Sequence, residues 1–574
     1  MKRLLKYMKG FGKECVLGPL FKLLEASFEL MIPLVVAGIV DTGIANSNTP
    51  HVIRMCLVMV ALGIVGLISA VTAQYFAARA AVGFAGRLRH ALMEHILRLS
   101  YTQIDRTGTS TLVTRMTSDV NQVQNGVNLT LRLLLRSPFV VFGAMIMAFT
   151  IDVQSALVFV ALIPVLCVVV FGIMLITMPM YKNVQNKLDK VTSATRQNLT
   201  GVRVLRAFCM EEAQTEDFRE NTSALTKIQL ASGRISALMN PLTFVIVNLA
   251  VVVLIPVGAL KVEGGVLSQG LVIALYNYMS QILVELIKMA NLIISMTKAA
   301  ACANRVADTL ELSVEPEGEH KLNCLHGKVE FRNVTGRYDG AAAPSLENVS
   351  FLAQPGQTVG IIGGTGSGKS TLINLIPGLY PAEQGSVLLD DQDVKDLNKD
   401  LLREVIGIVP QKAVLFRGTI RENLLWGREE ATDDELWEAL RTAQADQVVL
   451  SKEGGLDAVV EQGGTNFSGG QKQRLTIARA LVRKPAILIL DDSASALDYA
   501  TDAALRMAIR NMENPPTTFI VSQRAASVRY ADQILVLEDG ELAASGIHDE
   551  LLDSCPVYQE IYYSQFPKEV SSHG

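Results

Sequence analysis

The sequence predicts two joined architectures: a membrane α-helical domain of six spans, followed by a cytoplasmic α/β domain that carries a P-loop. Three observations lead to this prediction. Long apolar blocks fill the first half of the chain. Short apolar strand patterns alternate with helical patterns in the second half. The segment GGTGSGKST lies between a strand pattern and a helix pattern.

The composition supports a membrane protein. Of the 574 residues, 49% are hydrophobic and 19% are charged, and the mean hydropathy is +0.30. The net charge of −4 gives no argument for nucleic-acid binding. The cysteines show no CxxC spacing, so we expect neither a zinc site nor a disulfide framework. They are Cys15, Cys56, Cys167, Cys209, Cys302, Cys324 and Cys555.

Six spans are expected within residues 1–305. They lie at about 16–44, 55–83, 132–150, 155–178, 242–260 and 267–297. Several exceed the roughly 20 residues that cross a bilayer. The basic start MKRLLK precedes an apolar stretch that continues past Pro33, too far for a signal peptide, so we interpret it as an uncleaved first span. The short break TIDVQS predicts a tight hairpin between the third and fourth spans.

The distribution of positive charge predicts the orientation. The long, helix-like connections at 84–131 and 179–241 contain many Lys and Arg residues, whereas the opposite loops ANSNTPH, IDVQS and KVEGGVLSQ contain almost none. Positive residues favour the cytoplasmic side, so we expect both connections and both termini there. A polar linker at 306–324 then leads to a cytoplasmic domain at 325–574, with a largely parallel central sheet.

The P-loop carries the most specific chemistry in the sequence. Its glycines allow backbone N–H groups to approach phosphate oxygens at a helix N-terminus. Lys369 is expected to reach the terminal phosphates, and Ser370 to bind Mg²⁺. The predicted phosphate site consists of Gly363, Gly364, Thr365, Gly366, Ser367, Gly368, Lys369, Ser370 and Thr371.

Two later segments extend the predicted site. Asp491 follows four apolar residues, the usual place for a carboxylate that holds Mg²⁺ through water. In FSGGQ, Ser468, Gly469 and Gly470 offer a hydroxyl and bare N–H groups at an expected helix start, which predicts a second phosphate-binding surface.

After six spans, the order P-loop, FSGGQ and LILDDSASALD resembles the ATP-binding cassette (ABC) exporters, over essentially the whole chain. The resemblance implies the exporter fold and a half-transporter. Two such chains would make twelve spans and hold two ATP molecules between facing cassettes. Each ATP would contact the P-loop of one chain and the SGGQ of the other.

The resemblance also implies roles for single residues. Tyr338 would stack on adenine, Gln411 would contact Mg²⁺ and face the membrane domain, and Asp498 would communicate between sites. The stretches YTQIDRTGTSTLVTRMTSDV and TGVRVLRAF are similar to those flanking the coupling helices that dock on cassettes.

Two residues depart from the family pattern, which usually has Glu at position 492 and His at position 523. A glutamate there polarises the attacking water, and such base catalysis is worth about 10²–10⁴-fold within hydrogen-bond reach. Asp492 is one methylene shorter. Gln523 can donate a hydrogen bond but cannot supply a cationic or proton-shuttling group. We therefore expect this site to bind ATP and hydrolyse it slowly.

The intact FSGGQ favours a heterodimer of two different half-transporters. Ser468, Gly469, Gly470 and Gln471 would complete the hydrolytic site of the partner. Three alternatives stay open: a homodimeric exporter with slow ATPase, a non-hydrolysing ATP-gated membrane regulator, and import. The expected cargo is drug-like, lipid or peptide, and the expected location is a bacterial plasma membrane.

Charged residues also occur inside the expected spans. They are Lys22, Glu25, Glu29, Glu285 and Lys288. Such residues usually face the interior of a helix bundle or a wet cavity. Glu285 and Lys288 are three positions apart and could pair on one helical face. This pattern is more typical of structural pairs and interfacial residues, and Glu29 is the best single candidate for a cargo cavity.

Overall fold

The computed structural model describes residues 2–316, 318, 320 and 326–566. Cys324, one of the expected bystander thiols, lies outside these residues. The chain divides into two compact units, the first formed by Met1–Leu97 and Thr109–Leu312, the second by Arg98–Gly108 and Ser313–Gly574. The domain bounds expected from sequence, 1–305 and 325–574, stay a prediction.

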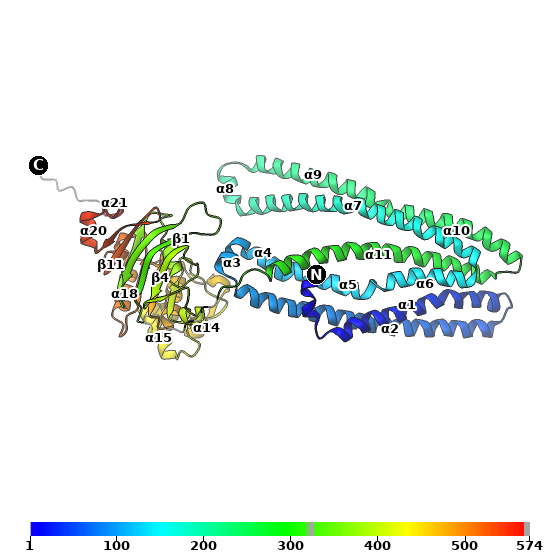
Figure 1. The fold of residues 1–574 in the computed structure, drawn as a ribbon, viewed down its shortest axis with the longest axis horizontal. Helices are drawn as coiled ribbons and strands as arrows, with labels where there is room; N and C mark the ends of the chain where they lie inside the picture. Colours follow the sequence, from blue (N-terminus) through cyan, green and yellow to red (C-terminus); the bar gives the residue numbers. More distant parts are fainter. Residues whose placement is uncertain (1, 317, 319, 321–325, 567–574) are drawn as a thin grey trace. The chain divides into compact units, whose positions relative to one another are not determined.

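The membrane unit consists of long helices (Figure 1). Among the described residues, six helical stretches are long and apolar enough to cross a membrane. They are Gly12–Ile44, Thr49–Leu97, Thr109–Ile151, Val153–Thr200, Glu211–Glu263 and Gln269–Thr309. Each contains one expected span, although the last begins two residues later than expected. The six-span prediction is confirmed.

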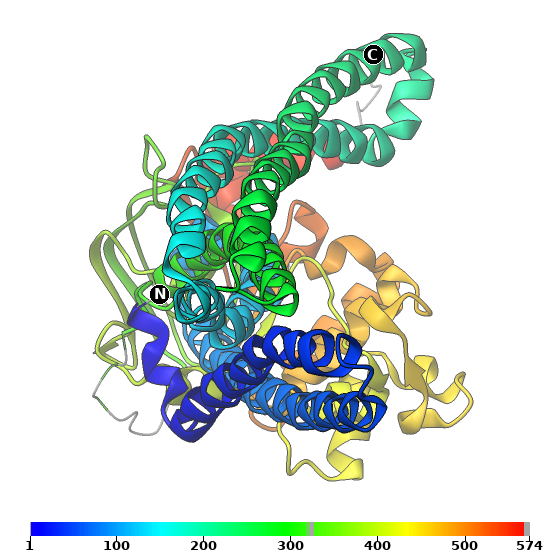
Figure 2. The same ribbon diagram turned by 90° about the vertical axis from the view of Figure 1, so that its right-hand side faces the viewer.

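The labels in Figure 1 follow these stretches. The main helices are α1 (Gly12–Gly38), α2 (Thr49–Leu97), α5 (Val120–Leu133), α6 (Arg136–Ile151), α7 (Val153–Thr200), α9 (Glu211–Ala237), α10 (Met239–Glu263) and α11 (Gln269–Thr309). The short helices α4 (Thr109–Thr114) and α8 (Val202–Ala207) belong to the same unit. Figure 2 shows the bundle nearly end-on.

Small residues allow the helices to approach closely. Gly18 of α1 faces Ala73 and Ala77 of α2, and a Cβ at Gly126 of α5 would lie 2.2 Å from that of Ala299. Close backbone approach of this kind is the usual basis of helix packing in membranes, where apolar burial between helices gives no advantage over lipid.

The predicted hairpin is confirmed, because Asp152 alone separates α6 from α7. Its Oδ2 accepts hydrogen bonds from Ser155 N at 2.8 Å and from Lys261 Nζ at 2.5 Å. The carboxylate therefore caps α7 and joins the hairpin to the end of α10.

A six-stranded sheet forms the centre of the second unit. Its order is β12-β11-β3-β10-β9-β6, and all neighbouring pairs are parallel except β11 with β12. The strands are β3 (Thr358–Gly363), β6 (Ile406–Val409), β9 (Ile487–Asp491), β10 (Thr517–Val521), β11 (Gln533–Glu538) and β12 (Glu541–Gly546). The predicted parallel sheet is confirmed.

A separate antiparallel sheet has the order β2-β1-β4-β5. Its strands are β1 (Val329–Gly336), β2 (Leu346–Ala353), β4 (Gln384–Leu389) and β5 (Gln392–Asp393). β1 alternates buried and less buried residues, whereas β3 is buried along almost its whole length. That difference is typical of antiparallel and parallel strands, respectively.

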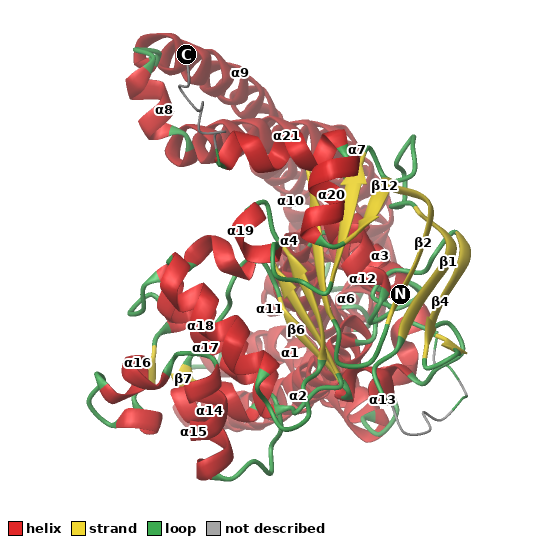
Figure 3. Cartoon of the chain, turned by 90° about the vertical axis from the view of Figure 1, so that its left-hand side faces the viewer, coloured by secondary structure: helices red, strands yellow, loops and turns green. Residues whose placement is uncertain are grey.

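Alternate residues of the parallel strands enter two different cores. On β9, Ile487 and Ile489 pack with α12 (Lys369–Leu375) and the antiparallel sheet. Leu488 and Leu490 pack on the other face, with α14 (Ile420–Leu425), α15 (Asp433–Thr442) and α17 (Gly469–Val482). Figure 3 shows helices around this sheet. The helix after the P-loop and the helix that begins at SGGQ thus cover opposite faces.

A short helix from the first half of the chain belongs to the second unit. α3 (Tyr101–Thr107) packs on the rest of this unit, where Tyr380 Oη donates to Asp105 Oδ2 at 2.5 Å. The rings of Tyr101 and Tyr380 are 6.1 Å apart. This helix lies in the first of the two stretches that are similar to those flanking coupling helices, and the second stretch contains α8.

Candidate nucleotide-binding site

Four strand ends bring the predicted site residues together. β3 ends at the P-loop, β9 at Asp491, and β6 and β10 shortly before Gln411 and Gln523. Because these strands are parallel neighbours, their carboxyl ends lie along one edge of the sheet. In open α/β sheets this edge is where ligands bind.

The P-loop folds around Lys369. Its ammonium donates hydrogen bonds to the carbonyl of Gly363 at 3.0 Å, to that of Gly364, and to Ser367 Oγ at 3.3 Å. Burial lowers the pKa of Lys369 below its ordinary value, and the carboxylates of Asp492 and Asp491 oppose this shift. The lysine is therefore held within the loop, at the edge of the sheet where Asp491 ends β9.

Two glycines of the loop are required by geometry. Gly368 has φ +93°, and a Cβ there would lie 2.4 Å from the carbonyl oxygen of Ser345. A Cβ at Gly363 would lie 2.2 Å from the carbonyl oxygen of Leu537. Both positions exclude other residues.

The site fits a nucleotide phosphate chain with Mg²⁺. A Cβ at Gly364 or Gly366 would meet nothing within 4 Å, so open space adjoins the loop backbone where phosphate oxygens would approach. No group of three or more His, Cys, Asp or Glu that could hold a metal occurs within the described residues.

Asp491 and Ser370 are the predicted Mg²⁺ residues nearest the loop. Asp491 ends β9 and is half-buried, and Ser370 is exposed in the first turn of α12. Burial and the neighbouring Asp492 carboxylate raise the pKa of Asp491, while Lys369 opposes the shift. A cation at this edge would favour the charged form of both aspartates.

Asp492 adopts a left-handed backbone with φ +43° and ψ 30°. Asp is among the few residues other than Gly that tolerate this region. Its N–H donates to the carbonyl of Val521 at 3.0 Å, and its Oδ2 accepts from Gln411 Nε2 at 3.4 Å. The structure thus brings together two predicted site residues from β6 and β9.

Gln523 is exposed, and its carbonyl accepts a hydrogen bond from Gln565 Nε2 at 2.8 Å. The next residue, Arg524, was missed by the sequence analysis. Its guanidinium donates to the carbonyls of Ala494, Ser495 and Leu497, each at 3.1 Å. Arg524 therefore ties the loop after β10 to the loop after β9. A cationic residue beside position 523 was the only available signal.

Asp498 caps α18 (Tyr499–Arg510). Its carboxylate accepts from the backbone N–H of Thr501 at 2.8 Å and from the Thr501 hydroxyl at 2.8 Å. These hydrogen bonds lower the pKa of Asp498. The cap stabilises the helix that follows SALD, and the proposed role of Asp498 between sites stays a prediction.

Tyr338 lies beside the P-loop helix. Thr371 Oγ1 donates to its hydroxyl at 3.3 Å, and its ring packs edge-on against Tyr380 at 5.1 Å. The structure therefore places Tyr338 beside α12, and its role in stacking on adenine stays a prediction.

The SGGQ segment starts α17 with a capping box. Ser468 Oγ accepts from Gln471 N at 3.3 Å, and Gln471 Oε1 accepts from Ser468 N at 2.9 Å. A Cβ at Gly469 would meet nothing within 4 Å, so the helix start is open. α17 covers the other face of the sheet from α12, and the expectation that SGGQ serves a second chain stays a prediction.

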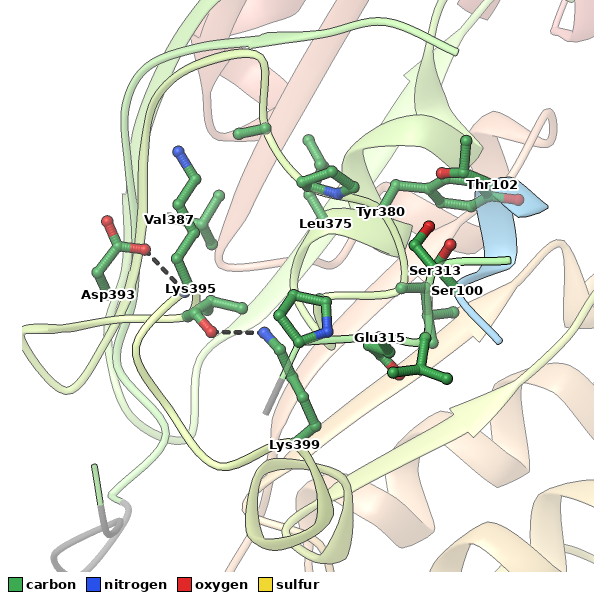
Figure 4. A pocket seen from close by; sticks show the side chains of 17 residues that line it. Ser100, Thr102, Ser313, Glu315, Leu375, Tyr380, Val387, Asp393, Lys395 and Lys399 are labelled. Carbon is green, nitrogen blue, oxygen red and sulfur yellow. Dashed lines mark hydrogen bonds between the residues drawn. The ribbon is translucent and has the colours of Figure 1, made fainter. Parts of the chain in front are cut away.

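The α3 joint holds a cavity of about 470 Å³ that the sequence did not indicate. Its walls are mostly apolar, and Ser100, Tyr380 and Glu315 also line it. Figure 4 shows Lys399 extended along the cavity, donating to the carbonyl of Val394 at 2.7 Å. Burial lowers the pKa of Lys399.

Glu29 lies in the membrane unit, away from these residues in the chain, and lines a different cavity of about 390 Å³. Its carboxylate accepts a hydrogen bond from Arg136 at 2.6 Å. Glu285 and Lys288 pair at 2.8 Å, which confirms that they share one helical face.

Comparison with known proteins identifies both halves. The family model of the ABC transporter transmembrane region matches residues 15–286, and that of the ABC transporter domain matches residues 346–495. An uncharacterised ABC transporter ATP-binding protein of Bacillus subtilis is 35% identical over the full length of both chains. A similar protein of Mycobacterium tuberculosis is 38% identical over 95% of each chain. An ATP-dependent lipid A-core flippase of Yersinia pestis is 27% identical over 98% of this chain and 97% of its own.

Proposed function

This chain belongs to the ABC transporter family as an exporter half-transporter, and we propose that it works in a heterodimer whose partner hydrolyses most of the ATP. The family assignment implies a multi-pass membrane protein that couples ATP hydrolysis to the transport of membrane-embedded cargo. The heterodimer, its division of labour, the cargo and the bacterial plasma membrane with cytoplasmic termini belong to the proposal. Nucleic acid has no part in it.

The need for a second cassette is supported by the two faces of the central sheet. The P-loop precedes α12 on one face, and Ser468 precedes α17 on the other. In the proposed assembly, each ATP contacts the P-loop of one chain and the SGGQ of the other. A second cassette facing the first would place its own SGGQ over this P-loop and receive Ser468 over its own.

The position of Asp492 supports the proposal that this chain mainly binds ATP and that its partner hydrolyses most of it. A general base must come within about 2.6–3.2 Å of the proton that it removes. The left-handed backbone at Asp492 and the hydrogen bond from its N–H to the carbonyl of Val521 fix the position of its Cα. From that position the aspartate carboxylate extends one methylene less far than a glutamate carboxylate would. Weak activation of water at this site follows from that reach.

The chain's own residues would hold ATP and Mg²⁺ without rapid turnover. Lys369 and the loop N–H groups would bind the phosphates, Ser370, Gln411 and Asp491 would hold the cation, and Tyr338 would stack on the base. Mg²⁺, when bound, neutralises charge on the phosphates. Gln523 would orient the terminal phosphate by a neutral hydrogen bond.

The test is phosphate release by the purified chain, alone and co-expressed with its candidate partner half-transporter. The proposal expects negligible turnover alone and turnover in the pair that survives Asp492→Ala. Replacing Ser468 by Ala should abolish turnover in the pair, because Ser468 would serve the partner's ATP. Strong turnover alone that disappears with Asp492→Ala would overturn the division of labour.

A homodimer with two slow sites is the second candidate. The 3.4 Å contact between Gln411 and Asp492 favours it, because the carboxylate of the predicted base reaches a predicted Mg²⁺ residue. In that case the chain alone would hydrolyse ATP slowly, and Lys369→Ala would abolish the activity.

A further inference from the structure

A polar stripe runs along the membrane helix α11. Its positions alternate spacings of four and three residues, which keeps them on one helical face. They are Asn277, Gln281, Val284, Lys288, Asn291, Ser295 and Lys298, and only Val284 is apolar. All are at least partly exposed. From Asn277 to Lys298 the stripe rises by about 31 Å at roughly 1.5 Å per residue.

Such a stripe is unfavourable against lipid tails. The hydrocarbon core is about 30 Å thick, and a charged side chain at its centre costs roughly 2.5–3.5 kcal/mol on insertion scales. These side chains therefore face a wet path. Two cavities, of about 390 and 370 Å³, lie along the stripe. The first is near Lys288, within the expected span, and the second is near Lys298 and residues 122–129, which belong to a connection expected in the cytoplasm.

Each cavity has an unpartnered polar atom. Within the described residues, Gln281 Oε1 is buried without a hydrogen-bond partner at the first cavity, and Asn128 Oδ1 likewise at the second. Buried polar groups are normally paired, so a small rotation of either side chain would let its oxygen accept a hydrogen bond from a group in the cavity.

The first cavity has one accessible charge of each sign. Arg136 is buried and donates to both Glu285 and Glu29, and Glu285 also accepts from Ser137 at 2.9 Å. The side chains of Arg136 and Glu285 are 6% and 3% exposed, whereas those of Glu29 and Lys288 are 37% and 43% exposed. Lys288 Nζ also donates to Glu285 Oε1 at 2.8 Å, so both outer groups already have one partner in the cluster. Each is partly exposed and keeps further hydrogen-bonding capacity, since an ammonium has three donors and a carboxylate about four acceptor sites, and can therefore meet a ligand.

We propose that this cavity binds the head of a zwitterionic amphiphile, with its ammonium on Glu29 and its phosphate on Lys288. The inference rests on the proposed export function and specifies its cargo. Asn277, Ser280 and Gln281 supply neutral hydrogen bonds beside the two charges. The stripe continues as a polar path for the head, while the tails stay in the bilayer.

The test is lipid binding to the full chain in mild detergent, measured by native mass spectrometry. The probes are short-chain phosphatidylethanolamine, phosphatidic acid with the same chains, and an alkylammonium with no phosphate. Phosphatidylethanolamine should bind about tenfold tighter than either. Glu29→Gln should remove the preference over phosphatidic acid, and Lys288→Gln the preference over the alkylammonium.

Glu216→Gln is the matched control, because Glu216 forms an exposed pair with Arg219 three positions away on α9, outside both cavities. It should leave all three affinities unchanged. Thermal unfolding checks each variant, and Ser280→Phe, which fills the cavity and keeps every charge, should weaken phosphatidylethanolamine binding about tenfold.

Equal affinity for the three probes, or a preference unaffected by Glu29→Gln and Lys288→Gln, would overturn the inference. A change of oligomeric state in place of lipid binding would assign the stripe to a subunit interface and would also overturn it. ATP turnover by the chain with its partner, measured separately, tests the proposed function and does not depend on these lipid results.

Discussion

Gln411 Nε2 donates to Asp492 Oδ2 over 3.4 Å, although 81 positions separate the two residues in the chain. The contact exists because β6 and β9 are parallel neighbours, with Val409 beside Leu490. It joins the loop after β6 to the residue at which this chain departs from the usual family pattern.

Replacing Asp492 should reveal which subunit hydrolyses ATP. With the partner present, Asp492→Ala is expected to lower phosphate release by less than about twofold, because base catalysis of roughly 10²–10⁴-fold would act at the other site. The double change Asp492→Glu with Gln523→His should raise turnover by the chain. Loss of all activity in the Asp492→Ala pair would contradict this prediction.

Replacing Lys369 should weaken nucleotide binding itself. Its ammonium is held among the carbonyls of Gly363 and Gly364 and is positioned for phosphate. We expect Lys369→Ala to raise the Kd of a fluorescent ATP analogue about 10- to 100-fold, as the loss of charge-assisted hydrogen bonds implies. The control is Lys328→Ala, because Lys328 directly precedes β1 of the antiparallel sheet. Equal Kd values for the two variants would refute a role of Lys369 in nucleotide binding.

Arg524 should stabilise the cassette by joining two loops. Arg524→Ala removes the hydrogen bonds to Ala494, Ser495 and Leu497 and should lower the free energy of unfolding by about 1–3 kcal/mol. Arg524→Lys should recover only part, since an ammonium lacks the planar fork. Denaturant unfolding measures both, and Arg529→Ala should have the smaller effect, because Arg529 lies over the exposed ring of Tyr530.

Tyr380→Phe should loosen α3 from the cassette. The change removes the hydrogen bond to Asp105, and burial together with that carboxylate raises the pKa of Tyr380, so its hydroxyl stays protonated as the donor. Loss of about 1 kcal/mol should speed amide hydrogen exchange of residues 98–108 about fivefold. Tyr530→Phe, at an exposed tyrosine, should leave that exchange unchanged.

His548 should make the cassette less stable in acid. Its Nδ1 lies 2.8 Å from Tyr558 Oη, and burial, reinforced by Arg529, lowers the pKa of His548. The unfolded chain then binds the proton more readily, so stability is full above the ordinary histidine pKa of about 6.5 and falls as the pH drops below it. The Tm should decrease between about pH 7.5 and 5.5, and His548→Gln should reduce that decrease. If His548→Gln shows the same decrease in Tm as the unchanged protein, the acid sensitivity belongs to other groups.

The sequence alone determined the features that short segments encode. Span lengths follow from contiguous apolar residues, and the P-loop and SGGQ follow from fixed spacings within one loop and one helix start. The pairing of Glu285 with Lys288 follows from positions on one helical turn. The sequence also showed that Asp492 and Gln523 differ from the usual Glu and His of the family, because the neighbouring motifs identify both positions.

Only the tertiary structure decided which distant residues meet. Local spacing gives no signal that Glu29 pairs with a residue of α6, or that Asp492 meets a residue after β6. It also does not predict that α3 packs with the cassette, or that α12 and α17 cover opposite faces of the sheet. Each depends on which helices and strands pack as neighbours, because burial and charge pairing select partners across the whole chain. Arg136 illustrates the point: one residue inside an apolar span becomes the centre of a charge cluster only when α1, α6 and α11 pack around it.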